Sequence, residues 1–517
     1  ADRAFCQGMT RVVYHTMPHS PPEAGVPGWS YQAGTHISPK MTWWDFSKPF
    51  HAYLARTSAL LQQGRFVADV AYYYGEAIPN FASGPKYLRP TLGPGYDYDD
   101  LNKEILLQSS VTADGRLQLP SGMTYRLLVL PDEPTMSLEV LQKIESLLRQ
   151  GATILGPRPE RVPGLRDYAA QDARLAALAN RIWGETDGRQ RRSYGRGTLY
   201  TGYAERDILQ EQGVAPDFRY TSSGEAALDY IHRTTAAEEI YFIRNRDSAR
   251  VQVLADFRVA GKQPRLYDPV SGKVTALPLY VEEEGRTTLP LALPPWGSIF
   301  VVFDGAPARH VIAVEQDGRE TFPVTAAPGG RFSHHPDGSI AFVPAAPGNY
   351  RLVFSDGTHR EWTDRDASIT REITGRWELR FPHGWGFDPL QAFDTLLDWT
   401  EQEDPALARF SGKAVYRKRF TLEEAALRDT LGWTLDLGRV GTVARVYLNG
   451  YEVGTSVFPP HRFDVSGLLR AGANHLVVEV ANTWLNQLIG EADLPVSQRR
   501  TRSNVGNADG PRLWSDY

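Results

Sequence analysis

Between residues 65 and 215, short runs of consecutive apolar residues alternate with stretches in which apolar residues recur at helical spacing. The segments RFVADVAYYY, YRLLVLP and ATILGP predict buried strands, and SLEVLQKIESLLRQG predicts a helix that begins at a serine and ends at a glycine. Continuously apolar strands separated by helices are typical of a parallel sheet. We therefore expect an α/β domain over residues 65–215, of a Rossmann-like or amidotransferase-like kind.

The segment DYDDLNKEILLQ predicts a further helix with acidic residues in its first turn. Its carboxylates, Asp97, Asp99 and Asp100, are spaced like half of a calcium loop, but the glycine and glutamate that complete an EF-hand are missing. Helix capping is the better interpretation of these three residues. No G-x-G-x-x-G follows a strand in this region, so the sequence lacks the phosphate cradle of a nucleotide-binding domain.

After residue 215 the pattern changes to short alternating strands separated by glycine, proline and asparagine turns. This pattern predicts a β-sandwich over residues 216–305, a small β domain over 306–372 and an antiparallel sandwich over 373–517. The whole chain is therefore expected to be multidomain, α/β plus β.

The first 64 residues predict a different arrangement. RVVYH (residues 11–15) predicts a buried strand that leads into a proline- and glycine-rich loop over residues 16–42. A loop of this length often has a function. A helix is expected over residues 43–63, ending at Gly64.

Composition and charge argue against several classes of partner and site. The formal net charge is -5, which gives no electrostatic reason to expect nucleic acid or an anionic membrane as partner. The single cysteine, Cys6, excludes internal disulfides and cysteine-based metal clusters. No apolar run approaches the roughly 18 residues of a membrane-spanning helix. The first residues lack the basic and apolar regions of a signal peptide.

The C-terminal sandwich carries a family pattern. In LDLGRVGTVARVYLNGYEVGTSVFPPHRFDVSGLLRAGANHLVVEVAN, a strand ends in the tight turn at Asn449 and Gly450, Gly454 follows, and Asp464 starts a later strand. This segment resembles the sugar-binding, galactose-binding-like jelly roll of family 2 glycoside hydrolases.

Both ends of the chain resemble a second family. DRAFCQGMTRVVYHTMPHSPP, the PGW, GTH and TWW sequences after it, and YLARTSALLQQGRFVADVAYYYGE resemble the C-terminal end of the catalytic barrel of family 106 α-L-rhamnosidases. NTWLNQLIGEADLP resembles a family segment that usually reads closer to N-x-W-x-N-R-L-I-G-D. Gln487 stands here where arginine is usual, and Glu491 where aspartate is usual.

The resemblance implies that residues 1–64 are the C-terminal end of a (β/α)8-type catalytic barrel, with the strand over residues 11–15 ending at the active-site rim. It also implies an inverting, calcium-dependent enzyme. Inversion uses two carboxyl groups roughly 6.5–9.5 Å apart. No carboxylate in this block matches the family's catalytic glutamates, so we expect the acid and base upstream of residue 1, and the N-terminal half of the enzyme as a partner.

These inferences predict a glycoside hydrolase that removes terminal α-L-rhamnosyl groups from plant glycosides or pectic polysaccharide side chains. Its expected partner molecules are rhamnose-containing oligosaccharides, polysaccharides or glycosides. A periplasmic or secreted location is expected, although a single cysteine fits the cytosol equally well. Two alternatives stay open: another multidomain glycoside hydrolase of the β-galactosidase or β-glucuronidase type, and a non-catalytic carbohydrate-binding fragment.

Candidate site residues follow from the resemblance. Expected substrate contacts at the barrel mouth are His15, His19, Tyr31, His36, Trp43 and Trp44. The alternative for the two tryptophans is that they anchor the helix. Glu76 is the carboxylate within the chain that could be catalytic, although a solvated strand end is the favoured interpretation. Candidate calcium ligands are Asn486, Glu491 and Asp493, with Asn482 beside them, because calcium takes oxygen ligands.

Overall fold

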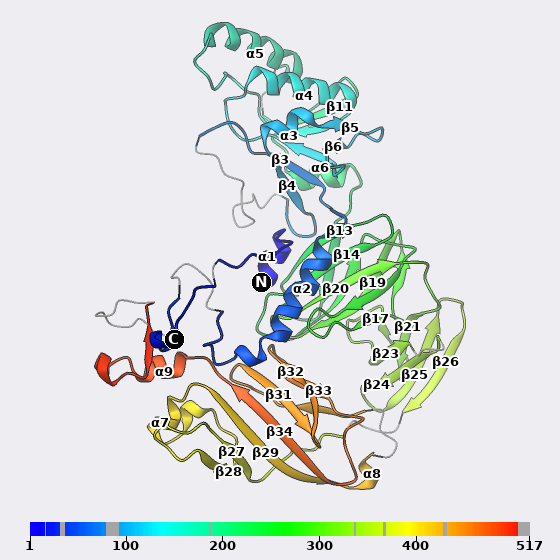
Figure 1. Ribbon diagram of the computed structural model, residues 1–517. Coiled ribbons are helices and arrows are strands. Elements are labelled where there is room, and N and C mark those ends of the chain that lie inside the picture. Colours follow the sequence, from blue (N-terminus) through cyan, green and yellow to red (C-terminus); the bar gives the residue numbers. More distant parts are fainter. Residues whose placement is uncertain are drawn as a thin grey trace. The chain divides into compact units, whose positions relative to one another are not determined.

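The computed structural model describes residues 1–15, 17–30, 37–78, 92–185, 188–334, 338–364, 369–427 and 432–504 (Figure 1). The chain divides into two compact units. The first comprises Ala1–Met9, Leu60–Tyr267 and Lys273–Ala367, and the second Thr10–Ala59, Asp268–Gly272 and Ser368–Tyr517. Among the described helices, none is both long enough and apolar enough to cross a membrane.

The first unit contains the predicted α/β sheet, with strand order β10-β11-β9-β8-β3-β4. Neighbouring strands are parallel except for the hairpin β10–β11, which confirms the predicted parallel arrangement. The strands are β3 (Val70–Tyr73), β4 (Tyr98–Leu101), β8 (Leu127–Val129), β9 (Thr153–Leu155), β10 (Gln190–Tyr194) and β11 (Gly197–Thr201). A separate small sheet is formed by β5 (Ser110–Val111), β6 (Leu117–Gln118) and β7 (Thr124–Tyr125).

Helices α4 (Leu138–Gln150) and α5 (Tyr168–Trp183) lie side by side against this sheet, as Figure 1 shows. Helix α4 buries residues at helical spacing in the same core as β8 and β9, namely Val140, Leu141, Ile144, Leu147 and Leu148. It ends as predicted at Gly151, whose φ of 119° suits a residue without a side chain. Helix α6 (Glu205–Glu211) contributes Ile208 and Leu209 to a second core cluster.

The helix predicted over DYDDLNKEILLQ begins later than expected, and helix capping by Asp97, Asp99 and Asp100 is wrong. Residues Tyr98–Leu101 form β4, whose backbone pairs in parallel with β3. Pairing with β3 gives these backbone groups the hydrogen bonds that a helix would otherwise provide. Helix α3 (Lys103–Gln108) follows, and its cap is Asn102, whose side chain accepts a 2.9 Å hydrogen bond from the Ile105 amide.

The predicted sandwich after residue 215 consists of two antiparallel sheets in the orders β12-β15-β19-β18 and β17-β16-β20-β14-β13-β2. Their inner faces share one aromatic-rich core that includes Tyr241, Phe257 and Phe303. The strands are β2 (Arg65–Phe66), β12 (Phe218–Ser222), β13 (Leu228–Thr234), β14 (Glu239–Asn245), β15 (Val251–Phe257), β16 (Gln263–Tyr267), β17 (Val274–Ala276), β18 (Val281–Glu283), β19 (Arg286–Leu293) and β20 (Ser298–Asp304).

A smaller β region follows, with a four-stranded sheet β22-β21-β25-β26 and the hairpin β23–β24. The strands are β21 (Val311–Gln316), β22 (Arg319–Phe322), β23 (Gly330–His334), β24 (Ile340–Pro344), β25 (Gly348–Phe354) and β26 (His359–Asp364). Helix α1 (Asp2–Cys6) also belongs to the first unit, where the buried Phe5 ring meets Phe242 edge-on at 6.0 Å.

The second unit contains the predicted antiparallel sandwich. Its main sheet has the order β28-β27-β29-β34-β31-β32, and a two-stranded sheet pairs β30 with β33. Asn449 and Gly450 have φ values of 53° and 88° and form the predicted tight turn between β31 and β32. The strands are β27 (Trp377–Arg380), β28 (Leu390–Phe393), β29 (Lys413–Leu422), β30 (Thr434–Asp436), β31 (Val443–Leu448), β32 (Tyr451–Ser456), β33 (Arg462–Asp464) and β34 (Gly472–Ala481).

Short helices and the N-terminal segment complete this unit. They are η1 (Pro22–Ala24), η2 (Trp44–Phe46), η4 (Trp399–Glu401), α7 (Pro405–Ala408), α8 (Glu424–Leu427), α9 (Leu485–Gly490) and η5 (Val496–Gln498). Helix α2 (Lys48–Leu61) is shorter than the helix predicted over residues 43–63, because Trp44–Phe46 form the separate η2 turn, and Gly64 follows α2 with a φ of 58°. Strand β1 (Val26–Gly28) pairs in parallel with β35 (Thr501–Ser503), which brings residues from the two ends of the chain together.

The predicted strand over residues 11–15 is absent from the described residues. No described segment pairs with Arg11–His15, and the side chain of Val13 is 81% exposed. A β-strand needs a hydrogen-bonded neighbour, and three consecutive apolar residues do not supply one. That part of the prediction is therefore wrong for the described residues, and the barrel over residues 1–64 stays a prediction, as do the domain boundaries.

Candidate functional site

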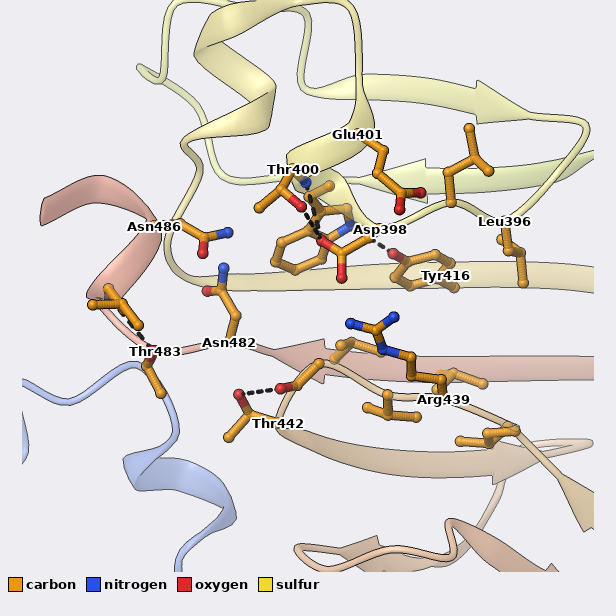
Figure 2. Close-up of a pocket in the computed structure, with 18 of the residues that line it drawn as sticks. Leu396, Asp398, Thr400, Glu401, Tyr416, Arg439, Thr442, Asn482, Thr483 and Asn486 are labelled. Atoms are coloured by element: carbon orange, nitrogen blue, oxygen red, sulfur yellow. Dashed lines mark hydrogen bonds between the residues drawn. The ribbon is translucent and has the colours of Figure 1, made fainter. Parts of the chain in front are cut away.

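A pocket of about 540 Å³ opens on the sandwich of the second unit (Figure 2). Five segments line it. They are the start of β27 at Trp377, the loop and η4 helix after β28 (residues 396–401), the middle of β29, the connection from β30 to β31 (residues 437–442) and the end of β34 with the start of α9 (residues 478–486). This volume falls within the range of small-ligand sites.

Aromatic residues form the base of the pocket. Trp399 is 6% exposed, and its indole N–H donates a 2.6 Å hydrogen bond to the hydroxyl oxygen of Tyr416. Burial raises the pKa of Tyr416 to about 12, so the hydroxyl stays protonated at neutral pH. Because its oxygen already accepts the indole N–H, Tyr416 can donate its own proton to a ligand.

Charged groups face the opening from two sides. Asp398 caps η4, where its Oδ1 accepts hydrogen bonds from the amide of Thr400 at 3.1 Å and from its hydroxyl at 2.8 Å. Glu401 is exposed on the same segment, and Figure 2 shows the Arg439 guanidinium pointing toward Asp398 and Tyr416 from the other side. Arg439 makes no hydrogen bond or ion pair with the residues that the structure describes. Its donors are therefore available to a ligand.

Two asparagines close the pocket near α9. Asn482 is structural, because its amide donates to the Phe410 carbonyl and accepts from the Gly412 amide, both at 2.8 Å. Asn486 lies at the start of α9 and lines the cavity. The pocket thus offers hydrogen-bond donors and hydrogen-bond acceptors beside the half-exposed side chains of Leu396 and Leu397. This combination suits a neutral polyhydroxylated ligand such as a sugar.

The described residues among the six predicted to contact substrate at the N-terminal end of the chain do not line this pocket. His15 and His19 are exposed, and Tyr31 and His36 lie outside the described residues. Trp43 packs against the small core of Phe46, Val443 and Ala481, which favours its interpretation as an anchor. Trp44 lies in η2 and is half-buried. A substrate role for these six residues stays a prediction.

The N-terminal loop is nevertheless attached to the edge of the pocket. The Thr42 hydroxyl donates to the Asn482 carbonyl, and the Trp484 indole donates to the Lys40 carbonyl at 2.8 Å. The ammonium group of Lys40 in turn binds the carbonyls of Pro21 and Gly25. Lys40 and Thr42 are thus tied to the segment that carries Asn486, and Lys40 links Pro21 and Gly25 to it.

Glu76 has a structural environment. Its Oε1 lies 3.0 Å from the Lys103 ammonium, and its Oε2 accepts a 2.8 Å hydrogen bond from the Ser137 amide at the start of α4. The Ser137 side chain makes no capping bond, so Glu76 fulfils that role and places a negative charge at the helix N-terminus. This environment accounts for Glu76 without a catalytic role.

Calcium binding by Asn486, Glu491 and Asp493 stays a prediction, and the surroundings of Glu491 argue against it. Glu491 is 2% exposed and accepts four hydrogen bonds, from Gln487 Nε2 at 2.5 Å, the Arg500 amide at 2.6 Å, and the Thr501 amide and hydroxyl at 2.9 and 2.6 Å. Burial alone would raise the pKa of Glu491, but these donors outweigh it and lower the pKa. Asp493 is exposed, and Asn486 lines the pocket. No cluster of three or more histidine, cysteine or acidic residues suited to a metal occurs among the described residues.

Sequence reasoning missed most of the pocket. Asp398, Glu401, Tyr416 and Arg439 come from segments that carry no shared motif. They meet because β29 and β31 both pair with β34, which lies between them in the sheet. The one local signal was the D-x-T pattern of Asp398 and Thr400, which is typical of a helix cap and not of ligand binding.

Comparison with known proteins identifies the family. A sequence model of α-L-rhamnosidases, glycoside hydrolase family 106, matches residues 1–281, which is more than half of the chain. The chain belongs to this family. A model of the galactose-binding-like domain of family 2 glycoside hydrolases matches residues 393–509, the region that holds most of the pocket.

Two relatives extend this result. The rhamnosidase from Novosphingobium sp. PP1Y is 28% identical, and its structure matches 99% of this chain with a TM-score of 0.77. A protein of Formosa agariphila, provisionally named a beta-glucuronidase, is 26% identical over 96% of this chain. This family 106 chain spans 44% of the rhamnosidase and 56% of the Formosa protein, about half the length of either relative.

Proposed function

We propose that the chain is part of a glycoside hydrolase that removes terminal α-L-rhamnosyl groups from plant glycosides or pectic polysaccharide side chains. The observation that carries this proposal is the match of nearly the whole chain to a solved rhamnosidase, at a TM-score of 0.77. Membership of family 106 supports the same activity.

The proposed reaction is an inverting hydrolysis. One carboxylic acid protonates the leaving oxygen, and a carboxylate on the opposite face of the sugar activates water. We propose that both groups lie in the portion of these enzymes that this chain does not span. In support, Glu76 is engaged with Lys103 and with the start of α4. Hydrogen-bond donors occupy both carboxylate oxygens of Glu491, so we propose that calcium is bound by other residues.

In this proposal the pocket of the second unit holds a neutral sugar unit of the substrate. Arg439 and Tyr416 donate to sugar oxygens, Glu401 and the second oxygen of Asp398 accept from sugar hydroxyls, and Leu396 and Leu397 cover the apolar face of the ring. None of these groups is assigned a proton-transfer role.

A panel of 4-nitrophenyl glycosides tests the specificity. We expect the protein, completed by a polypeptide that supplies the rest of the family fold, to hydrolyse the α-L-rhamnoside and to leave the β-D-galactoside intact. Hydrolysis of the galactoside without the rhamnoside would overturn the proposal.

A second candidate activity is β-glucuronidase, because the relative from Formosa agariphila carries that name. The 4-nitrophenyl β-D-glucuronide in the same panel separates the two activities. Turnover of the glucuronide at a higher kcat/KM than the rhamnoside would favour this candidate.

A further inference from the structure

A second cavity, of about 870 Å³, lies within the first unit, between the α/β sheet and the β-sandwich. Its wall consists of connections: residues 64–69 around β2, residues 122–124 before and in β7, residues 212–215 after α6, the β13–β14 turn at 234–236 and the β18–β19 turn at 284–286. The pocket of the second unit is a separate site lined by different residues.

The charged residues that line this cavity are mostly cations. Five are arginines and two are acidic, namely Arg65, Arg116, Arg126, Arg258, Arg286, Asp69 and Glu284. Most of the arginines already have acceptors. Arg258 donates to both oxygens of Asp69 at 3.1 Å, Arg286 binds Asp256 at 2.7 Å and Arg116 binds Asp114 at 2.8 Å. Arg65 donates to the carbonyl of Gly122 at 2.7 Å, an acceptor without a full charge.

Arg126 is the exception. It connects β7 to β8, and its guanidinium makes no hydrogen bond or ion pair with any described residue. Burial lowers the pKa of Arg126, and repulsion from Arg116 and Arg258 adds to this effect despite the nearby carboxylates of Asp114 and Asp69. A partly buried guanidinium beside other cations is unfavourable unless an anion enters to balance it.

We propose that this cavity binds the oxyanion group of a small anionic ligand, with Arg126 as its main contact and Arg65 and Arg116 beside it. A guanidinium presents two parallel donors that match the oxygens of a carboxylate, sulfate or phosphate. The cavity volume lies in the range of small-molecule sites, so it can hold more than a bare ion. An acidic sugar unit and a free inorganic anion share this chemistry, and the test distinguishes them.

The test is isothermal titration calorimetry at constant ionic strength with sodium phosphate, sodium sulfate and D-galacturonate, using chloride and neutral D-galactose as references. We expect at least one of the three anions to bind, and Arg126→Gln to weaken its affinity tenfold or more, because a hydrogen bond to a charged group is lost. Binding of galacturonate alone assigns the site to a sugar acid, and equal binding of the inorganic anions assigns it to a free oxyanion.

Arg319→Gln is the matched control, because the Arg319 side chain is exposed in β22 and its guanidinium makes no hydrogen bond or ion pair with the described part of the chain. Its affinity for the anion should equal that of the wild type. The ligand-free Arg126→Gln protein should melt at the same temperature as the wild type or higher, since repulsion has been removed. The proposal is overturned if no anion binds better than chloride, if Arg126→Gln binds as the wild type does, or if the ligand-free variant melts lower.

Discussion

Replacing Glu491 by glutamine tests whether this buried carboxylate is a structural acceptor or a metal ligand. Its two oxygens accept four hydrogen bonds, two of them from the backbone amides of Arg500 and Thr501. Thr501 begins β35, which pairs with Val26 of β1. The carboxylate therefore holds the end of the described chain against the N-terminal loop.

The expected loss can be worked out from these contacts. A glutamine keeps one carbonyl oxygen and turns an NH2 group toward two donors, Gln487 Nε2 and the Arg500 amide. Gln487 can adapt by rotating its amide, because its own Oε1 is buried without a hydrogen-bond partner among the described residues. About one to two charge-assisted hydrogen bonds are then lost, and the β1–β35 pairing should become less stable by about 2 to 4 kcal/mol.

Hydrogen–deuterium exchange measures this pairing directly. In Glu491→Gln, peptides covering residues 26–28 and 499–503 should exchange roughly 30- to 900-fold faster, because each 1.36 kcal/mol is tenfold. Peptides from β34 should be unchanged. Glu378→Gln, which alters an exposed carboxylate in β27, serves as the control. Exchange within a factor of two of the wild type, or stabilisation by calcium in the wild type that the variant lacks, would refute the structural interpretation.

Three further predictions address other regions. Arg439→Ala should weaken binding of a neutral sugar to the second unit by about tenfold without lowering the melting temperature, as calorimetry and thermal melts will show. Phe5→Ala should destabilise the first unit by about 3 to 5 kcal/mol in urea denaturation, because Phe5 is fully buried. Burial lowers the pKa of His232, but Asp217 at 3.0 Å and Glu239 at 3.1 Å outweigh burial and raise the pKa above its ordinary 6.5. The stabilisation by His232 is therefore complete below pH 6.5 and is lost as the pH rises through the raised pKa. The pKa values of both carboxyl groups are lowered, so their stabilisation is lost in acid, and the stability difference between wild type and His232→Gln should be largest between pH 4.5 and 6.5.

Local signals predicted the parts of the fold that depend on local physics. The helical spacing and terminal glycine of α4 and the Asn449–Gly450 turn were read correctly because each is determined within a few residues. The strand expected over residues 11–15 was not, because an apolar triplet becomes a strand only when a neighbour pairs with it. At Tyr98–Leu101 a neighbouring strand is present. These residues suit the start of a helix, but they form a strand because they pair with β3.

The residues of the candidate site are harder to predict from the sequence than the helices and turns are. The resemblance identifies the family correctly, but it does not show what surrounds Glu491, because a carboxylate in a sequence gives no information about its donors. The four hydrogen bonds that occupy it come partly from Arg500 and Thr501, whose amides could not be placed beforehand. Likewise, the position of the Arg126 guanidinium beside Arg116 and Arg258 becomes visible only once its neighbours are known.

The rate of 4-nitrophenyl α-L-rhamnoside hydrolysis by this chain, first alone and then with a polypeptide that supplies the rest of the family fold, tests where the catalytic carboxylates lie. We expect no release of nitrophenol above the enzyme-free rate from the chain alone, and release from the completed protein. Hydrolysis of the rhamnoside by the chain alone, at the rate of the completed protein, would contradict the claim that the catalytic carboxylates lie outside these residues.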